Sequence, residues 1–172
     1  MELWDLYDRD RRPLGRLHER GKPLAEGEYH LSVHIAIFST DGRMLIQRRT
    51  DDRLSWGGLW DISAAGSVTA GENSAEGAHR ELFEELGLDR DFTDNRPRFS
   101  INYRGGFGDY YFIIEDVDLA DVVPQPTEVA EVRYATREEI HELLDEDKFI
   151  PYHPGFIDFL FDMRAGYTTH RK

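Results

Sequence analysis

The residues best suited to chemistry are three glutamates in one short segment, Glu81, Glu84 and Glu85. On a helix, which advances about 100° per residue, Glu81 and Glu85 share one face because they are four residues apart. Glu84 is three residues from Glu81 and points further toward solvent, with Arg80 as the adjacent cation. Like charges this close repel each other unless a positive charge lies between them. Carboxylate clusters of this kind suit Mg²⁺ or Mn²⁺.

The simplest alternative is a solvated acidic helix face, which is the usual role of a run of charged residues. Two features of the sequence favour a binding site instead. A turn bracketed by Gly66 and Gly71 precedes the segment. The acidic residues also border an apolar stripe that must face the core, whereas a solvated face would lie opposite to it. This stripe consists of Ala75, Ala78, Leu82 and Leu86.

Capping signals predict a helix from about Ser74 to Leu86 in this segment. Asn73 is a suitable N-cap, and Glu76 is the expected capping-box partner three residues further on. Gly87 stands where a helix usually ends, because glycine adopts the left-handed conformation without strain. The glutamates are therefore expected on a rigid element.

Strands and two further helices are predicted around this helix from runs of β-branched and aromatic residues and from apolar spacing. The predicted strands are 3–7 and 14–17 as an N-terminal hairpin, 29–38 and 44–47 as a second hairpin, 59–65, 99–103 and 110–115 joined by a turn at 105–108, and 129–134. The further helices are 137–147 and a short one after Pro154. Because helices are interspersed among strands, the fold class is α/β, with helices covering a mixed sheet.

Length, charge and composition narrow the class of protein. The 172 residues fit one domain over 1–172. A formal net charge of −13 argues against nucleic acid and anionic membranes as partners. The absence of cysteine excludes disulfides and thiol nucleophiles, and no stretch approaches the roughly 20 apolar residues of a membrane span. A cytoplasmic location is expected, and a homodimer is left open.

Residues 66–88 resemble the Nudix box and match all nine of its specified positions. The matching residues are Gly66, Glu72, Arg80, Glu81, Leu82, Glu84, Glu85, Gly87 and Leu88. The resemblance implies an α/β/α sandwich with a mixed β-sheet, to which the N-terminal β-hairpin is added. It also implies a Mg²⁺- or Mn²⁺-dependent hydrolase. Its substrate would be a nucleoside diphosphate linked to another group, or a related small organic diphosphate.

The same resemblance implies roles for individual residues. Glu81 and Glu85 would be the main metal ligands, Glu84 a further or water-bridged ligand, and the Gly66 carbonyl oxygen an additional one. The metal would neutralise the diphosphate and lower the pKa of a bound water, which attacks one phosphorus. Glu72 and Arg80 would form a buried pair that braces the loop against the helix.

The base that orients the water is expected either in the box or in a later segment. The candidates are Glu84 and Glu85 inside the box, and Glu128 and Glu131 outside it. General-base catalysis requires such a group within hydrogen-bond reach of the water. The alternative for Glu128 and Glu131 is a structural role as loop or strand-edge acids.

Substrate contacts are expected from arginines and aromatic residues. Arg48 and Arg49 follow the second strand of the second hairpin and could bind phosphate oxygens in a bidentate manner. Alternatively, they could be exposed arginines beside Asp51 and Asp52. Aromatic rings could cover the organic part of the substrate, or could belong to the core. The main aromatic candidates are Trp60 and Tyr103, followed by Trp56 and Phe107.

Segments outside the box resemble the Nudix branch related to isopentenyl diphosphate isomerase, which makes an isomerase the first alternative function. His30 matches a metal-binding histidine of that enzyme, but its catalytic cysteine and another histidine are replaced by Ala65 and Ser67. Without the cysteine that mechanism lacks its acid, so hydrolysis is favoured. A second alternative is a Nudix domain that senses nucleotides without turnover, which would be expected to lose box carboxylates. None is lost here.

Overall fold

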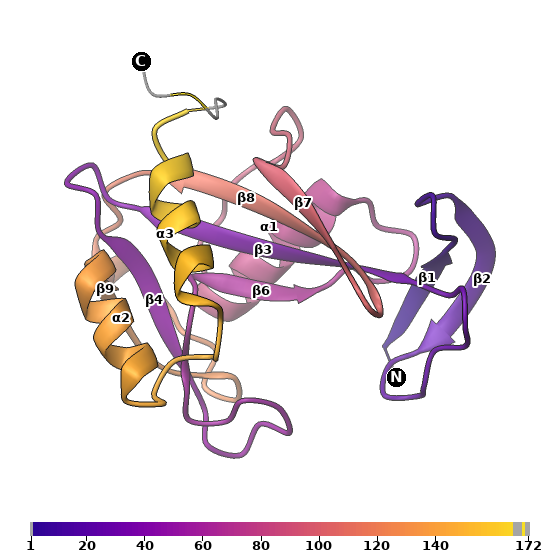
Figure 1. The fold of residues 1–172 in the computed structure, drawn as a ribbon, viewed down its shortest axis with the longest axis horizontal. Helices are drawn as coiled ribbons and strands as arrows, with labels where there is room; N and C mark the ends of the chain where they lie inside the picture. Colours follow the sequence, from indigo (N-terminus) through magenta and orange to yellow (C-terminus); the bar gives the residue numbers. More distant parts are fainter. Residues whose placement is uncertain (1, 167–169, 171–172) are drawn as a thin grey trace.

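A seven-stranded mixed sheet forms the centre of the protein, and a two-stranded hairpin packs at its end (Figure 1). The computed structural model describes residues 2–166 and 170. The strands are β1 Leu3–Tyr7, β2 Pro13–Glu19, β3 His30–Phe38, β4 Met44–Arg49, β5 Trp60–Asp61, β6 Ala64–Ser67, β7 Phe99–Tyr103, β8 Gly106–Ile114 and β9 Val129–Ala135. The helices are α1 Ser74–Leu86, α2 Arg137–Asp145, α3 Pro154–Met163 and a 3-10 turn at Leu119–Asp121. Within the described residues, none of the helices has the length and apolar character needed to cross a membrane.

Strand β3 organises the sheet. It runs parallel to β8 along its whole length, and the residues of its first half pair antiparallel with β6. It pairs with β4 only at Phe38, opposite Met44. The predicted hairpin of β3 and β4 is therefore closed at its turn, after which the strands diverge and β6 takes the place beside β3.

The predicted strand over 59–65 is divided by a bend at residues 62–63. Ser63 lies in this bend and links the two diverging strands. Its hydroxyl accepts a hydrogen bond from the Ile37 amide at 2.8 Å and donates one to the Leu45 carbonyl at 2.5 Å. The bend explains why β5 pairs with β4 while β6 pairs with β3.

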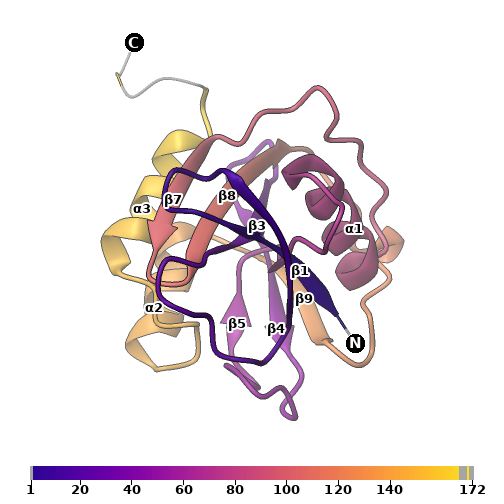
Figure 2. The ribbon, with the colours of Figure 1, turned by 90° about the vertical axis from the view of Figure 1, so that its right-hand side faces the viewer.

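Helices cover both faces of the sheet, with α1 on one face and α2 and α3 on the other (Figure 2). Successive residues of a strand point to opposite faces. Val33 and Ile35 of β3 accordingly belong to the core beneath α1, whereas Ala36 and Phe38 belong to the core beneath α2 and α3. The α/β/α sandwich with a mixed sheet and an N-terminal hairpin that the sequence predicts is confirmed.

Helix α1 has the predicted bounds because its caps are formed as expected. The Asn73 side chain accepts hydrogen bonds from the amides of Ala75 and Glu76 at 2.9 and 3.1 Å. The Glu76 carboxylate accepts a hydrogen bond from the Asn73 backbone amide at 2.7 Å, which completes the capping box. Gly87 ends the helix with a φ of 69°, in the left-handed region.

Strand β8 begins at Gly106, whereas the sequence predicted Tyr110. Tyr103 lies opposite Gly106, so the turn between β7 and β8 consists only of residues 104 and 105. A Cβ atom on Gly106 would lie 2.1 Å from the His30 carbonyl oxygen. This glycine is present because two parallel backbones approach closely, which a sequence pattern cannot distinguish from a turn.

The N-terminal hairpin of β1 and β2 is a separate sheet that packs beside the start of β3 (Figure 1). Tyr7 and Tyr29 exchange two backbone hydrogen bonds of 2.8 and 3.0 Å. The Ala70 amide, in the loop before α1, donates to the Leu3 carbonyl at 2.8 Å. The Trp4 ring also stacks on His30 with centroids 4.2 Å apart. These contacts bring the hairpin close to the box.

Asp109 of β8 connects the hairpin to the rest of the protein. Its carboxylate accepts hydrogen bonds from Ser74 at the start of α1 (2.6 Å) and from Ser100 of β7 (2.5 Å). It also forms a bidentate ion pair with Arg11, in the turn of the hairpin. Burial alone would raise the pKa of Asp109, but the hydrogen bonds from Arg11, Ser100 and Ser74 outweigh it and lower the pKa. The ionised carboxylate therefore stabilises the fold above its ordinary pKa, and this contribution is lost as the pH falls through the lowered value.

Replacing Asp109 by Asn is expected to destabilise the protein by about 3 kcal/mol at pH 7, because it leaves Arg11 without its carboxylate. Urea unfolding measures the difference. Asp10→Asn is the control, because Asp10 is exposed and its ion pair with Arg12 is long, at 3.8 Å. An exposed pair of this kind contributes between zero and about 1 kcal/mol. Equal losses in the two variants would contradict the role of Asp109.

Candidate active site

The three box glutamates differ in their exposure in the order that the sequence predicts. Glu85 is buried, with 2% of its surface exposed. The Glu81 side chain is 13% exposed, whereas that of Glu84 is 51% exposed. Packing therefore restricts Glu81 and Glu85 more than Glu84, whose more exposed side chain is held, among the described residues, only by Arg80.

Glu85 reaches from α1 to the place where β4 and β6 lie near each other. Its Oε2 accepts a hydrogen bond from Gln47 Nε2 of β4 at 2.8 Å and another from the Ala65 amide of β6 at 3.1 Å. Burial, followed by repulsion from Glu81, raises the pKa of Glu85 well above its ordinary value. A nearby cation would relieve this cost.

Glu81 lies against the end of β6. A Cβ atom added to Gly66 would be 2.0 Å from the carboxyl carbon of Glu81, so only glycine lets the strand end and the carboxylate meet. Burial raises the pKa of Glu81 to about 6, although attraction to Arg80 opposes the shift. The Gly66 backbone and two shielded carboxylates are thus brought together, as the box resemblance implies.

Arg80 connects the loop and the helix of the box through hydrogen bonds. It donates to both oxygens of Glu72 at 2.8 and 3.1 Å, to Glu81 at 2.8 Å, to Glu84 at 3.0 Å and to the Ser67 carbonyl at 2.8 Å. Burial alone would raise the pKa of Glu72, but hydrogen bonds from Arg80 and the loop outweigh it and lower the pKa. This geometry fits the predicted brace, although both side chains are partly exposed, at 22% and 23%.

The donor set suits Mg²⁺ or Mn²⁺, which prefer carboxylate and carbonyl oxygens. Within residues 2–166 and 170, however, no three Asp, Glu or His side chains are already gathered into a metal-binding group. The reason is that Glu81 and Glu84 both point to Arg80. A metal ion would have to compete with this guanidinium for both carboxylates.

A cavity of about 570 Å³ carries three arginines, so we call it the arginine cavity. The charge of Glu81 in the box contributes to the raised pKa of Arg20, which lines this cavity. Its lining includes Arg20, Arg49, Arg53, Trp4 and Glu128. Arg20 and Trp4 belong to the N-terminal hairpin or its end, far from the box in sequence. Sequence reasoning missed Arg20, because only the docked position of the hairpin brings it here.

Arg48 and Arg49, the two arginines predicted to bind phosphate, lie on opposite faces of β4. Arg49 lines the arginine cavity, and among the described residues no carboxylate lies within 4.0 Å of its guanidinium. Arg48 lies 3.5 Å from Glu131, its cross-strand neighbour, and 3.5 Å from Asp51. Neighbouring strand residues point to opposite faces, so the prediction that both arginines share one site is wrong for Arg48.

Glu128, the candidate base outside the box, lies at the wall of the arginine cavity. Arg53 pairs with it at 2.9 Å. Its charge also contributes to the raised pKa of Glu85. Glu131 lies on the Arg48 side and does not line this cavity.

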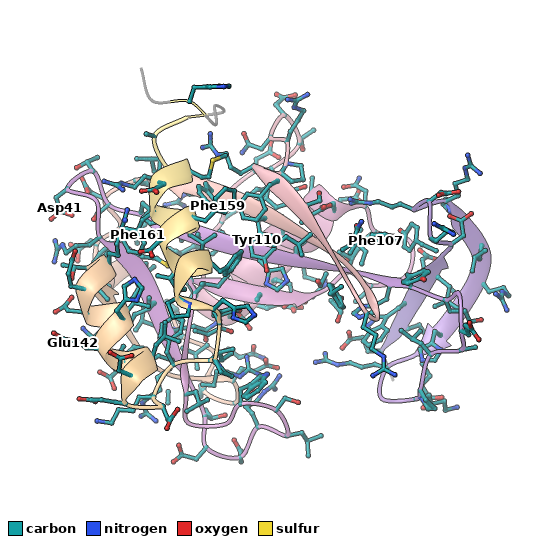
Figure 3. The ribbon with its side chains drawn as sticks, viewed as in Figure 1. Asp41, Phe107, Tyr110, Glu142, Phe159 and Phe161 are labelled. Carbon is teal, nitrogen blue, oxygen red and sulfur yellow. The ribbon has the colours of Figure 1, made fainter. Side chains whose placement is uncertain are left out.

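The aromatic candidates fall in different places. Trp60 is only 7% exposed and packs in the core beneath α2 and α3, with the Arg133 guanidinium 5.0 Å from its ring, so the expected substrate contact is wrong. Phe107 is likewise buried, and it lies toward the N-terminal hairpin (Figure 3). Trp56 is 52% exposed on the loop after β4. Tyr103 lines a second cavity of about 460 Å³, on the sheet face between β6 and β7, which we call the sheet-face cavity.

Comparisons with known proteins agree with this arrangement. The NUDIX domain family model matches residues 28–156. An uncharacterised Nudix hydrolase from Listeria innocua is 44% identical and covers 99% of both chains. An isopentenyl-diphosphate Delta-isomerase from Pectobacterium atrosepticum is 31% identical and covers 78% of this chain and 76% of its own. The crystal structure of DR0079 from Deinococcus radiodurans has a TM-score of 0.75 at 19% identity, and covers 92% of this chain and 98% of that one.

The α/β/α sandwich with a complete box helix against the end of β6 defines a Nudix fold. The chain belongs to the Nudix hydrolase family. The predicted resemblance to isopentenyl diphosphate isomerases is also confirmed, at lower identity.

Proposed function

We propose that the protein hydrolyses a diphosphate linkage in a small molecule and requires Mg²⁺ or Mn²⁺ for it. The observation that carries this proposal is the burial of Glu81 and Glu85 one turn apart on α1, where Glu81 meets the end of β6. Two carboxylates in this position are costly without a cation. A diphosphate needs both a cation and fixed arginines around it.

The chain offers a distinct group for each requirement. Glu81 and Glu85 would hold the metal, with Glu84 and the Gly66 carbonyl oxygen as further ligands. The bound ion supplies charge neutralisation at the diphosphate and acidifies water for attack on phosphorus. Gln47 and the Ala65 amide orient Glu85, as the partners of metal ligands commonly do.

The arginine cavity would hold the rest of the diphosphate. Among the described residues no carboxylate lies within 4.0 Å of the Arg49 guanidinium, and Arg20 and Arg53 line the same cavity. Glu128 can orient the attacking water if substrate draws Arg53 away from it, which makes it the base proposed here. Because Glu128 now shares Arg53, its role depends on substrate being present.

A screen of small diphosphates in the presence of Mg²⁺ tests the proposal. The panel should hold nucleoside diphosphates linked to a further group and simple organic diphosphates, and the readout is released phosphate or nucleotide. Turnover of at least one compound is expected. The proposal would be contradicted if none were hydrolysed with either Mg²⁺ or Mn²⁺ while the protein was folded.

Replacing Arg49 by Ala is expected to raise KM for the hydrolysed compound about 10-fold or more. The reason is that hydrogen bonds between charged groups contribute roughly 1.5–3 kcal/mol each. Arg48→Ala is the matched control, because it removes the same side chain from the next residue and the opposite face. That variant should stay within about 2-fold, as expected for an exposed ion pair. Equal effects of the two changes would contradict the assignment of Arg49 to the phosphate.

Isomerisation of isopentenyl diphosphate is not expected, although the isomerase relatives give a reason to test it. Ala65, which stands where those enzymes would carry their cysteine, offers no proton. The measurement is deuterium incorporation from D₂O into the compound, at saturating Mg²⁺. Incorporation above the uncatalysed rate would show that another acid acts here and would favour the isomerase function.

A further inference from the structure

The sheet-face cavity is a hollow on one face of four neighbouring strands, β6, β3, β8 and β7. Its volume of about 460 Å³ lies in the range of small-molecule sites. Small residues create it, because Ala65 and Gly108 flank His34 and Ser32 on adjacent strands. Tyr110, seen on β8 in Figure 3, stacks on His34 with centroids 4.4 Å apart and forms one wall.

The lining of this cavity carries no charge. Among the described residues that form it, none is an Asp, Glu, Lys or Arg. Among the residues that line it, only His34 has a side chain whose ordinary pKa lies near 7. Burial lowers the pKa of His34 to about 4. The imidazole is therefore neutral at pH 7, in contrast to the guanidinium groups of the arginine cavity.

Several polar groups in the wall are bonded to one another, whereas the buried Nδ1 atom of His34 has no hydrogen-bond partner among the described residues. The Tyr103 hydroxyl donates to Ser32 Oγ at 3.3 Å and lies 3.0 Å from His30 Nε2. Ser32 Oγ in turn donates to the Phe107 carbonyl at 3.3 Å and lies 3.2 Å from His34 Nε2. A ligand with many donors and acceptors would leave its own groups unpaired here, which is costly.

The cavity also adjoins the candidate metal site. Gly66 lines it, and this glycine contacts the carboxylate of Glu81 from the side of α1. Ser32, His34 and Ala65 point to the α2/α3 face of the sheet, whereas the box carboxylates lie on its α1 face. A group attached to a diphosphate held by these carboxylates would therefore pass the end of β6 to reach the aromatic wall.

We infer that the sheet-face cavity binds an uncharged, mainly apolar organic group of the substrate, so that the protein selects organic diphosphates over nucleoside diphosphates. This inference rests on the proposed function. The apolar group lies against the rings of Tyr110 and Tyr103 and the side chain of Ile101, and burial of its surface provides the selectivity.

Calorimetric titration with non-hydrolysable analogues tests the selection. The probes are the benzyl and adenosyl esters of methylenediphosphonate, with unsubstituted methylenediphosphonate as the reference, all at saturating Mg²⁺. The benzyl ester is expected to bind about 10-fold or more tightly than the adenosyl ester. Equal affinity, or tighter binding of the adenosyl ester, would overturn the inference.

A bulky substitution at the rim locates the organic group. Ile101→Trp should fill part of the cavity and weaken the benzyl ester about 10-fold or more, because Ile101 lines it and is 37% exposed. Asn102→Trp is the matched control on the opposite face of β7 and should leave the affinity within about 2-fold. An unchanged affinity in Ile101→Trp would place the organic group elsewhere and refute the inference.

The reference probe separates this inference from the proposed function. Mg²⁺-dependent binding of methylenediphosphonate, without a preference between the two esters, would refute only the organic-group pocket. If none of the three probes bound with Mg²⁺, the proposed function would fail, and the inference that rests on it would fail with it.

Discussion

Replacing Glu85 by Gln is expected to lower turnover by about 10³-fold or more while the protein stays folded. The substitution keeps the volume of the side chain but removes a negative charge from the proposed metal shell, where Lewis-acid assistance contributes several kcal/mol. The buried carboxylate is costly when no cation accompanies it. With metal removed by a chelator, the variant should therefore unfold at the same or a higher temperature than the parent protein.

Glu84→Gln is the control for this variant. Glu84 carries the same group on the same helix, but its side chain is 51% exposed and bonded to Arg80. Its loss should cost clearly less turnover than that of Glu85. Steady-state rates at saturating and at limiting Mg²⁺ compare the two. Full activity of Glu85→Gln at limiting metal would rule out Glu85 as a main ligand.

Replacing Gly66 by Ala should lower turnover about 100-fold, the second-largest effect expected. The new Cβ atom would lie 2.0 Å from the Glu81 carboxyl carbon, so this side chain must move away from the end of β6. A displacement of about 1 Å in a catalytic arrangement can cost about 100-fold in rate. The backbone of Gly66 needs no positive φ, so the change acts through Glu81 rather than through backbone strain.

Gly155→Ala provides the comparison, because no atom lies within 4 Å of the Cβ position there. It should keep the parent rate. Titration of Mg²⁺ should show weaker binding to Gly66→Ala and unchanged binding to Gly155→Ala. Turnover of Gly66→Ala within about 3-fold of the parent would show that the contact between Gly66 and Glu81 does not position the carboxylate.

The parts of the fold that depend on local sequence were predictable. Helix α1 begins and ends as expected, because Asn73, Glu76 and Gly87 act on neighbouring backbone groups. The order of exposure of the box glutamates followed from the helical period alone. The family resemblance implied that Glu81 and the Gly66 carbonyl would serve one metal site, and the structure places these two residues in contact.

Parts that depend on contacts between distant segments were not predictable. The lining of the arginine cavity includes Arg20, which reaches it because the N-terminal hairpin is docked by distant contacts such as the ion pair of Arg11 with Asp109. Glu85 meets Gln47 only because β3 and β4 diverge after a short hairpin. Gly106 was predicted to lie in a turn, whereas in the structure it allows the backbones of β3 and β8 to approach closely. Each of these requires knowledge of which strands are neighbours.

The central claim is that carboxylates on α1 act through a divalent metal ion to cleave a diphosphate. The most direct measurement is the hydrolysis rate of a compound identified in the screen, first after exhaustive chelation and then after Mg²⁺ is returned. We expect no turnover above the uncatalysed rate in the chelated protein and full recovery on addition of Mg²⁺. Undiminished hydrolysis after chelation would contradict the account.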